Sequence, residues 1–329
     1  FPGPRHLAAG PDAPRPSVNV FIPALGYAAR HGRIILVLGL VAGILLPGIA
    51  VTVKGWLPEL VAGTLFVAAL RVGPRQAVGA LGDLGKSAAL CAVLQVAMPV
   101  AAILGFRLLG WHGGWQGLLA TGLTLMAAAP SISGSPNLAI LTGHDPAPAL
   151  RLLVLGTALL PLTVIPVFWL APALGSPAVI LGSAARLLLI IFASAAAAFL
   201  LRATVFRDPA PASIAALDGM SALLMAVMVV GLMSAVGPAL SGDPMALAFN
   251  MAAAFAANFG LQIAAFFMLR RRGSANAVPL AIVTGNRNIA LFLTALPTAI
   301  TDPVLLFIGC YQVPMFLTPI MLNRLYRRR

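Results

Sequence analysis

The stretch APSISGSPNLAIL, residues 129–141, interrupts an otherwise apolar segment with two prolines, a glycine, three serines and an asparagine. A second stretch, AIVTGNRNIALFL at residues 281–293, places a glycine, two asparagines and an arginine inside another apolar segment. Gly134, Pro136 and Gly285 are residue types that permit a helix to unwind. Inside a bilayer, unwinding leaves backbone N–H and C=O groups without partners, at several kcal/mol each, unless protein, water or substrate satisfies them. Two such segments therefore predict a functional centre within the membrane.

The composition around these stretches identifies the class of protein. The 329 residues are 60% apolar and 9% charged, whereas soluble chains carry about 25% charged residues. This excludes an ordinary soluble domain. The net charge of +13 does not indicate nucleic-acid binding, because nearly every basic residue flanks an apolar block. The blocks are continuously apolar rather than alternating, so the sequence predicts an all-α polytopic membrane protein.

A window of roughly 19 residues finds ten apolar segments. They lie at about 34–50, 56–71, 87–109, 115–142, 149–172, 177–201, 214–240, 244–269, 277–301 and 303–322. With the N-terminus inside, 17 Lys and Arg residues fall in inner segments and only Lys54, Arg107 and Arg186 in outer ones, while Arg287 remains within a span. The positive-inside rule therefore predicts a multi-pass protein of the cell inner (plasma) membrane with both termini cytoplasmic. We expect residues 1–30, which begin Pro/Gly-rich and polar, to form a disordered cytoplasmic tail.

The two interrupted segments are related by a repeat of about half the chain. Asn137 and Asn288 lie 151 positions apart, and the starts of the first and sixth apolar segments are about 145 positions apart. The spacing predicts one five-helix repeat over residues 31–175 and a second over 176–326, inverted because five is an odd number. Inverted repeats with a broken helix at matching positions indicate a secondary transporter with its binding site near the midplane. The alternative is a pair of kinks with purely structural roles.

Three motifs carry a resemblance to a known family: LQVAMP at 94–99, SISGSPNLAILTG at 131–143 and TGNRNIAL at 284–291. They resemble the bile acid:sodium symporter family, part of the bile/arsenite/riboflavin transporter superfamily, across a ten-helix layout from about residue 30 to 326. Asn258, in the run AANFGL, also falls on a family-like polar position. The resemblance implies a panel domain and a core domain, with helices four and nine crossing at the centre of the core.

The chain departs from this family at the sodium sites, which the resemblance would build from a Glu and a Gln of helix nine and from hydroxyls of helix five. The positions equivalent to the cation site are Gln95, Asn137, Val283 and Arg287. Val283 stands at the Glu position, Arg287 at the Gln position, and the helix-five hydroxyl positions are Leu150 and Val154. Amides without a carboxylate make a poor site for a hard cation. We therefore predict transport without the family's sodium sites, the alternative being a sodium symporter whose cation site is rebuilt.

Arg287 is the one basic residue within a span. A charged arginine at mid-bilayer costs about 2.5–3.5 kcal/mol on insertion scales, so it should face a polar cavity or a partner. In one interpretation it fills the vacated cation site and organises the crossover carbonyls and the side-chain oxygens of Asn137 and Gln95. In another it binds a substrate carboxylate or sulfonate bidentately. A structural alternative has the guanidinium satisfied by backbone carbonyls, with no role in transport.

Together these features predict a secondary transporter of a small organic anion that works by alternating access, without a cofactor or metal. The residues predicted to bind substrate are Ser133, Ser135, Asn137, Thr284, Asn286, Arg287 and Asn288. Facilitated diffusion, proton symport and exchange all remain open as modes of coupling. A membrane-embedded enzyme is the competitor from another class, but it needs paired acids, a nucleophile with its base or a metal-binding motif, and none is visible. We therefore expect a transporter, whose partners are the organic anion and the bilayer rather than nucleic acid.

Two acidic residues near span ends have simpler interpretations. His144 and Asp145, in the run TGHDPAPAL, indicate a cap and turn, with a proton relay as the alternative. Asp302 precedes Pro303, a pairing typical of an N-cap followed by proline at the first helical position.

Overall fold

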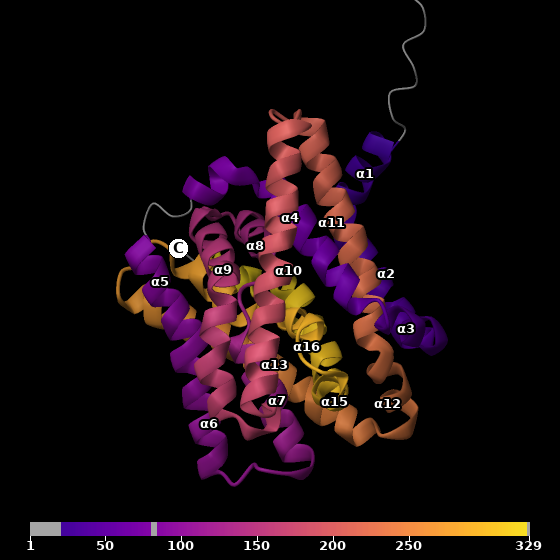
Figure 1. The fold of residues 1–329 in the computed structure, drawn as a ribbon, viewed down its shortest axis with the longest axis vertical. Helices are drawn as coiled ribbons and strands as arrows, with labels where there is room; N and C mark the ends of the chain where they lie inside the picture. Colours follow the sequence, from indigo (N-terminus) through magenta and orange to yellow (C-terminus); the bar gives the residue numbers. More distant parts are fainter. Residues whose placement is uncertain (1–20, 80–83, 328–329) are drawn as a thin grey trace, which may run out of the picture.

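The computed structural model describes residues 21–79 and 84–327 (Figure 1). Within these residues every regular element is helical, and seven helical stretches are long and apolar enough to cross a membrane. An eighth is added if the pair α1 and α2, bent by 80°, counts as one span. The predicted class, an all-α polytopic membrane protein, is confirmed. The count of ten is not reached, because the predicted segments at 34–50, 115–142 and 277–301 are each divided into shorter helices.

Besides the 3-10 helix η3 (Pro172–Leu174), the first half of the chain runs through nine α-helices and one π-helical turn among the described residues. They are α1 (Phe21–Arg30), α2 (Gly32–Leu45), α3 (Pro47–Lys54), α4 (Leu57–Gly79), α5 (Leu84–Ala92), the π-helical turn η2 (Val93–Ala97), α6 (Met98–Leu108), α7 (Gly114–Ala128), α8 (Ser135–Leu141) and α9 (Ala147–Leu170). Helix α1 occupies the last part of the predicted disordered tail, and residues 1–20 lie outside the described residues. The helix forms because its apolar residues pack against α11, where the main chain of Leu25 lies directly over Gly219.

The second half contains the longest helices. It comprises α10 (Pro177–Thr204), α11 (Pro211–Leu232), α12 (Val236–Gly242), α13 (Pro244–Arg271), α14 (Ala277–Gly285), the 3-10 helix η5 (Ile289–Thr294), α15 (Thr298–Thr301), α16 (Leu305–Met321) and α17 (Asn323–Tyr326). Helices α10, α11 and α13 each begin with proline at the first helical position, where no N–H is needed. The carboxylate of Asp243 caps α13 by accepting a hydrogen bond of 2.9 Å from the N–H of Ala246. These local signals explain why the long helices begin where they do.

The helices pack as two groups that each draw on both halves of the chain. Helices α1, α2, α3 and α4 pack with α10 and α11, while α5 to α9 pack among themselves and with α14 and α16, on which α13 packs in turn. The two groups meet where α10 packs against α9, beside each other in Figure 1. Within the first group, a Cβ at Gly39 would lie 2.6 Å from the carbonyl oxygen of Ala226, and one at Gly43 would lie 2.6 Å from Cβ of Met233. Glycine therefore lets α2 approach α11 closely, as small residues do between membrane helices.

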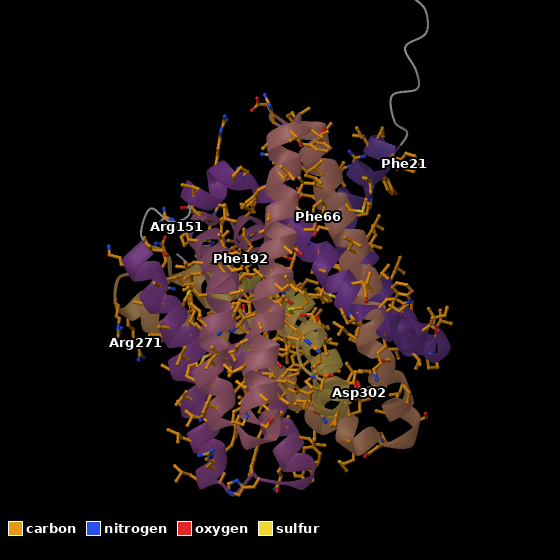
Figure 2. All side chains as sticks on the ribbon, in the orientation of Figure 1. Phe21, Phe66, Arg151, Phe192, Arg271 and Asp302 are labelled. Carbon is orange, nitrogen blue, oxygen red and sulfur yellow. The ribbon has the colours of Figure 1, made fainter. Side chains whose placement is uncertain are left out.

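Two ion pairs join elements at the periphery. Arg71 of α4 pairs with Asp218 of α11. Lys54 at the end of α3 pairs with Asp302 across 2.8 Å, near the end of α15 (Figure 2). The predicted N-cap at Asp302 is therefore wrong: Thr301 occupies the cap position of the following 3-10 turn, and the carboxylate faces the ammonium group of Lys54 instead.

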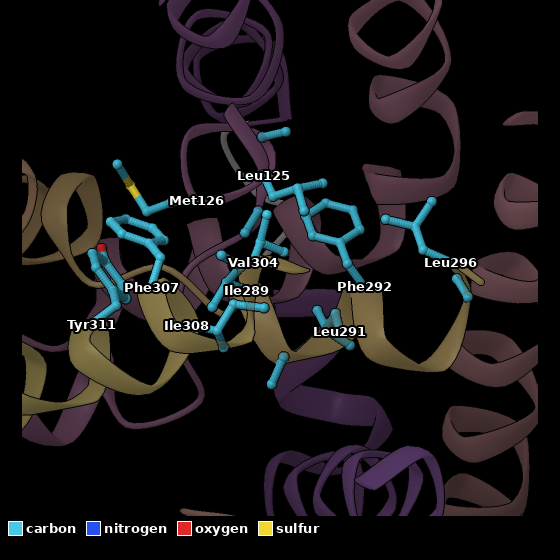
Figure 3. Close-up of a cluster of buried hydrophobic side chains, with 14 of the residues drawn as sticks. Leu125, Met126, Ile289, Leu291, Phe292, Leu296, Val304, Phe307, Ile308 and Tyr311 are labelled. Atoms are coloured by element: carbon cyan, nitrogen blue, oxygen red, sulfur yellow. The ribbon is translucent and has the colours of Figure 1, made fainter. Parts of the chain in front are cut away.

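The largest apolar cluster surrounds the two interrupted segments (Figure 3). Side chains of α7, η5 and α16 meet there, among them Leu125, Met126, Ile289, Leu291, Phe292, Phe307, Ile308 and Tyr311. Phe292 is fully buried, and its ring centroid lies 5.4 Å from that of Phe168 on α9. Close packing of this kind fixes the neighbouring backbone, so the breaks are held by rigid surroundings.

Candidate functional site

The two interrupted segments contact each other directly. Helix α7 ends at Ala128 and α8 begins at Ser135, while α14 ends at Gly285 and η5 begins at Ile289. Between them, Ser131 and Arg287 form an isolated antiparallel bridge. The N–H of Ile132 donates to the carbonyl of Asn286 at 3.1 Å, and the N–H of Asn288 donates to the carbonyl of Pro130 at 2.8 Å. Each unwound piece therefore satisfies backbone groups of the other, which is what unwinding away from water requires. We call this contact the crossover.

The guanidinium of Arg287 lies at the crossover and is almost wholly enclosed, with 1% of the residue exposed. Its Nη2 donates to the carbonyl of Leu94 at 2.5 Å and to the carbonyl of Ala127 at 2.7 Å. Its Nε is buried and has no hydrogen-bond partner. One cation thus links three parts of the chain: the π-helical turn η2, the end of α7 and the break after α14.

A proline and a helix end explain why these particular carbonyls are free to accept. In η2 the N–H of Met98 donates to Val93, and Pro99, the next residue, has no N–H, so nothing within the helix reaches the carbonyl of Leu94. Ala127 lies in the last turn of α7, where carbonyls lack intrahelical partners. Arg287 thus donates hydrogen bonds to two carbonyls that have no donor within their own helices.

The electrostatics of the crossover also favour a cation. Helices α7 and α14 both end there, and the C-terminal end of a helix carries a partial negative charge. Among the described residues Arg287 forms no ion pair with a carboxylate. Its positive charge is therefore balanced by helix ends and carbonyls rather than by an acidic side chain.

These contacts distinguish between the interpretations of Arg287. Its bonds go to backbone carbonyls, as expected for a fixed charge that organises the crossover, but not to the side-chain oxygens of Asn137 or Gln95. Gln95 is 2% exposed, and its Oε1 instead accepts a bond of 3.0 Å from the hydroxyl of Thr163. The structural alternative explains the two bonds of Nη2 equally well. The structural alternative does not explain why Nε of Arg287 is buried without a hydrogen-bond partner.

The four positions equivalent to the family's cation site share no hydrogen bond in the described part of the chain. Asn137 is exposed, whereas Val283 is buried in an apolar cluster with Cys91 and Leu152. Gln95 and Arg287 approach each other only through the neighbouring carbonyl of Leu94. The side chains at these four positions therefore form no shared cation site, and the guanidinium of Arg287 is held by backbone carbonyls instead.

The residues predicted to bind substrate divide by exposure. Buried are Ser135, Thr284, Asn286 and Arg287; Ser133 and Asn288 are partly buried; Asn137 is exposed. The hydroxyl of Ser131 donates to Ser135 Oγ at 2.6 Å, and the hydroxyl of Thr284 returns to the carbonyl of Leu280 at 2.7 Å. Only Ser133, Asn137 and Asn288 therefore keep surface that an anion can reach in this conformation.

A buried polar network holds the end of α14 and extends beyond the predicted site. Nδ2 of Asn258 donates to the carbonyl of Gly285 at 2.7 Å. Nε2 of Gln262 donates to Asn258 Oδ1 at 2.6 Å and to Thr318 Oγ1 at 3.0 Å. The hydroxyl of Tyr326 donates to Oε1 of Gln262 at 2.9 Å. Every polar atom of the Gln262 amide group is thus engaged.

The network also reaches Asn286 and α16. The hydroxyl of Thr318 donates to Asn286 Oδ1 at 3.2 Å, and Nδ2 of Asn286 donates to the carbonyl of Ile282 at 2.9 Å. The hydroxyl of Tyr311 donates to the carbonyl of Gly285. Asn286 therefore acts as a support of the crossover backbone here, rather than as a free ligand.

Gln262 is expected to be the most sensitive member of this network. We predict that Gln262→Met lowers the free energy of unfolding by about 2–4 kcal/mol, because it removes three hydrogen bonds and leaves buried partners unpaired. Tyr326→Phe removes one bond and should cost about 0.6–1.7 kcal/mol. Thermal unfolding of the purified variants in lipid nanodiscs measures the difference, and equal losses would contradict the arrangement.

The polar residues after α8 form a turn. Oδ1 of Asp145 accepts a bond of 2.9 Å from the N–H of Ala147 at the start of α9, and Nδ1 of His144 lies 2.9 Å from the carbonyl oxygen of Thr142. The predicted turn is confirmed, but Pro146 rather than Asp145 occupies the N-cap position of α9. Across residues 21–79 and 84–327, no group of three or more His, Cys, Asp or Glu side chains is placed to hold a metal ion.

Comparison with known proteins adds no further guide to the site. No protein-family model matches the chain, and no curated protein matches it. The chemistry of the crossover therefore has to be read from its own contacts: a buried guanidinium, two freed carbonyls and one unpaired N–H.

Proposed function

We propose that this protein is a secondary transporter of a small organic anion, a divergent member of the bile acid:sodium symporter family that works by alternating access. The observation that carries the proposal is the crossover, where two broken helices are joined around a buried cation. Irregular backbone at membrane depth is tolerated where protein or a water-filled cavity satisfies it, and broken helices of this kind form the binding sites of transporters.

The arrangement of helices supports two inverted five-helix repeats. The break between α7 and α8 and the break after α14 occupy corresponding places in residues 31–175 and 176–326. Each of the two helix groups takes members from both halves, so each repeat contributes to both. The group of α1 to α4 with α10 and α11 then serves as the panel, and the remaining helices serve as the core. Movement of one group against the other would expose the crossover first to one side and then to the other.

The role of Arg287 follows from its fixed position. A sodium-coupled carrier must bind and release its cation, whereas a guanidinium attached to the chain stays in place through every cycle. Its charge stabilises the facing helix ends without sodium, and an arriving anion meets a positive site whose Nε–H has no protein partner. In the same two segments, the partly buried Ser133 and Asn288 and the exposed Asn137 provide accessible polar groups. This favours transport of an organic anion without the family's sodium sites.

Reconstitution in proteoliposomes tests this function. We expect uptake of a small carboxylate or sulfonate that persists when choline replaces sodium and is accelerated by the same anion preloaded inside the vesicle. A panel for that assay can be chosen by thermal stability, since a ligand that prefers the folded state raises the melting temperature. Loss of uptake in choline would favour a sodium symporter with a rebuilt cation site, and absence of trans-stimulation would overturn the carrier.

A further inference from the structure

A cavity of about 180 Å³ lies at the end of α7 opposite to the crossover. It is bounded by α6, by the loop that leads into α7 and by the segment after α9, at the end of the molecule where α6 and α7 are joined in Figure 1. None of the residues predicted to bind substrate lines it. Its lining combines apolar side chains with the polar side chains of Arg107, His112, Thr121 and Thr124, so it has an apolar body and a few polar groups. That combination is typical of small-molecule sites.

Two aromatic side chains, Phe106 and Trp111, line the cavity. Their rings are stacked on each other, with centroids 5.5 Å apart and planes 5° apart. Ile103 and Leu174 also line the cavity and are buried. These side chains favour the apolar part of a ligand.

Thr124 supplies a polar group within the cavity. The residue is 3% exposed and lines the cavity, yet its hydroxyl makes no hydrogen bond to any residue that the structure describes. Its neighbour Thr121 differs, because its hydroxyl is already engaged by the carbonyl of Gly117 at 2.8 Å. The hydroxyl oxygen of Thr124 is not among the fully enclosed polar atoms that lack a partner, so this hydroxyl opens onto the cavity. Thr124 therefore offers one hydrogen-bonding group to a ligand in the cavity.

Arg107 supplies the charge. Its Nη2 donates to the carbonyl of Leu170, in the last turn of α9, at 2.5 Å, and this bond holds the guanidinium beside the cavity. Arg107 is an exposed residue, and the other N–H groups of its guanidinium have no protein partner among the described residues. A guanidinium presents five donors in a planar fork that matches a carboxylate.

We propose that this cavity binds a small monocarboxylate, with its apolar part against Phe106 and Trp111 and its carboxylate shared between Arg107 and the hydroxyl of Thr124. The volume is below the roughly 300–1,000 Å³ of sites for drug-sized ligands, so it suits a molecule of the size of benzoate. Because α7 runs from this cavity to the crossover, we assign the cavity as the first binding site of the transported anion. That assignment as an entry site rests on the proposed function, whereas the binding itself does not.

Binding is tested with benzoate and the purified full chain in nanodiscs, followed by tryptophan fluorescence and calorimetry. We expect saturable binding with a fluorescence change that disappears in Trp111→Phe, and a loss of at least about tenfold in affinity for Arg107→Gln, equivalent to about 1.4 kcal/mol. Arg186→Gln, which removes an exposed arginine of α10, is the matched control and should bind as the wild type does. Thr124→Val removes the hydroxyl without disturbing the Arg107 bond, so it keeps the test valid if Arg107→Gln weakens the fold. Absence of saturable binding, or wild-type affinity in both Arg107→Gln and Thr124→Val, would overturn the site.

Transport assays separate this inference from the proposed function. Arg287→Ala should lose transport but still bind benzoate, because it lies at the other end of α7. Binding of benzoate by a protein that transports no organic anion would overturn the proposed function and support the site. Undiminished transport of benzoate by Arg107→Gln and Thr124→Val, with their binding lost, would overturn the entry role.

Discussion

Arg287→Ala is expected to abolish transport of organic anions while still giving a protein that can be purified. The change leaves the carbonyls of Leu94 and Ala127 buried without a donor, at about 1–3 kcal/mol each, and removes the charge that faces the ends of α7 and α14. Uptake into proteoliposomes and the melting temperature should therefore both fall. Arg287→Lys retains the charge but not the planar fork, so we expect partial recovery of stability with reduced transport.

The control for this experiment is Arg186→Gln, since Arg186 is an exposed arginine within a long apolar helix. Normal transport by Arg287→Ala would show that the guanidinium is only scaffolding. A double variant sharpens the test: Arg287→Gln with Val283→Glu moves the crossover toward the composition of a sodium site. If neither transport nor its sodium dependence changes in that variant, the assignment of these positions is wrong.

Gly285→Ala is expected to be the most damaging single-methyl change in the crossover. A Cβ at residue 285 would lie 2.3 Å from the carbonyl oxygen of Asn258 and 2.4 Å from Cγ of Gln262. Since the nearer atom is helix backbone, α14 would have to move away from α13, which breaks the bond from Asn258 to the carbonyl of Gly285. Overpacking costs about 1–3 kcal/mol, and the lost bond adds to it. We expect a lower melting temperature and loss of transport.

Gly260→Ala provides the matched control on the helix that receives the clash. Gly260 is exposed within α13, and no atom lies within 4 Å of its added Cβ. Alanine is favoured over glycine in a helix interior by about 0.5–1 kcal/mol, so this variant should be as stable as the wild type or more so. Equal melting temperatures for the two alanine variants would contradict the close contact between α13 and α14.

The two breaks could be predicted from the residues that cause them, whereas their crossing was implied only by the family resemblance. Gly134, Pro136 and Gly285 are helix-breaking residues in apolar surroundings, and Arg287 beside one break is costly to place within a span. The partners of Arg287 could not be predicted from side chains, because a carbonyl belongs to every residue. Pro99 was a usable signal, since it removes the donor that would have occupied the carbonyl of Leu94 in the π-helical turn.

The polar network was predictable only in part. Asn258 and Gln262 stand four positions apart in an apolar helix, so their shared face could have been inferred from the sequence. Thr318 and Tyr326 join them from beyond α14, and that depends on how the helices are rotated about their axes. Side-chain packing between helices decides those rotations, and they cannot be derived from the spacing of polar and apolar residues in the sequence alone. For the same reason α1 was assigned to the tail, since its packing on α11 depends on a glycine far along the chain.

The π-helical turn η2 aligns two places that lie far apart along one span. Such a turn adds one residue to the α-helical winding, and one residue corresponds to about 100° around the axis. The inserted residue therefore sets how far α6 is rotated about its axis relative to α5. With this rotation the carbonyl of Leu94 faces Arg287, and Ile103 and Phe106 line the benzoate-sized cavity. Deleting one residue from Val93–Ala97 would rotate α6 relative to α5. Either the carbonyl of Leu94 would then no longer face Arg287, or Ile103 and Phe106 would no longer line the cavity. One irregular turn thus fixes the orientation of the crossover carbonyl and of the cavity lining relative to each other.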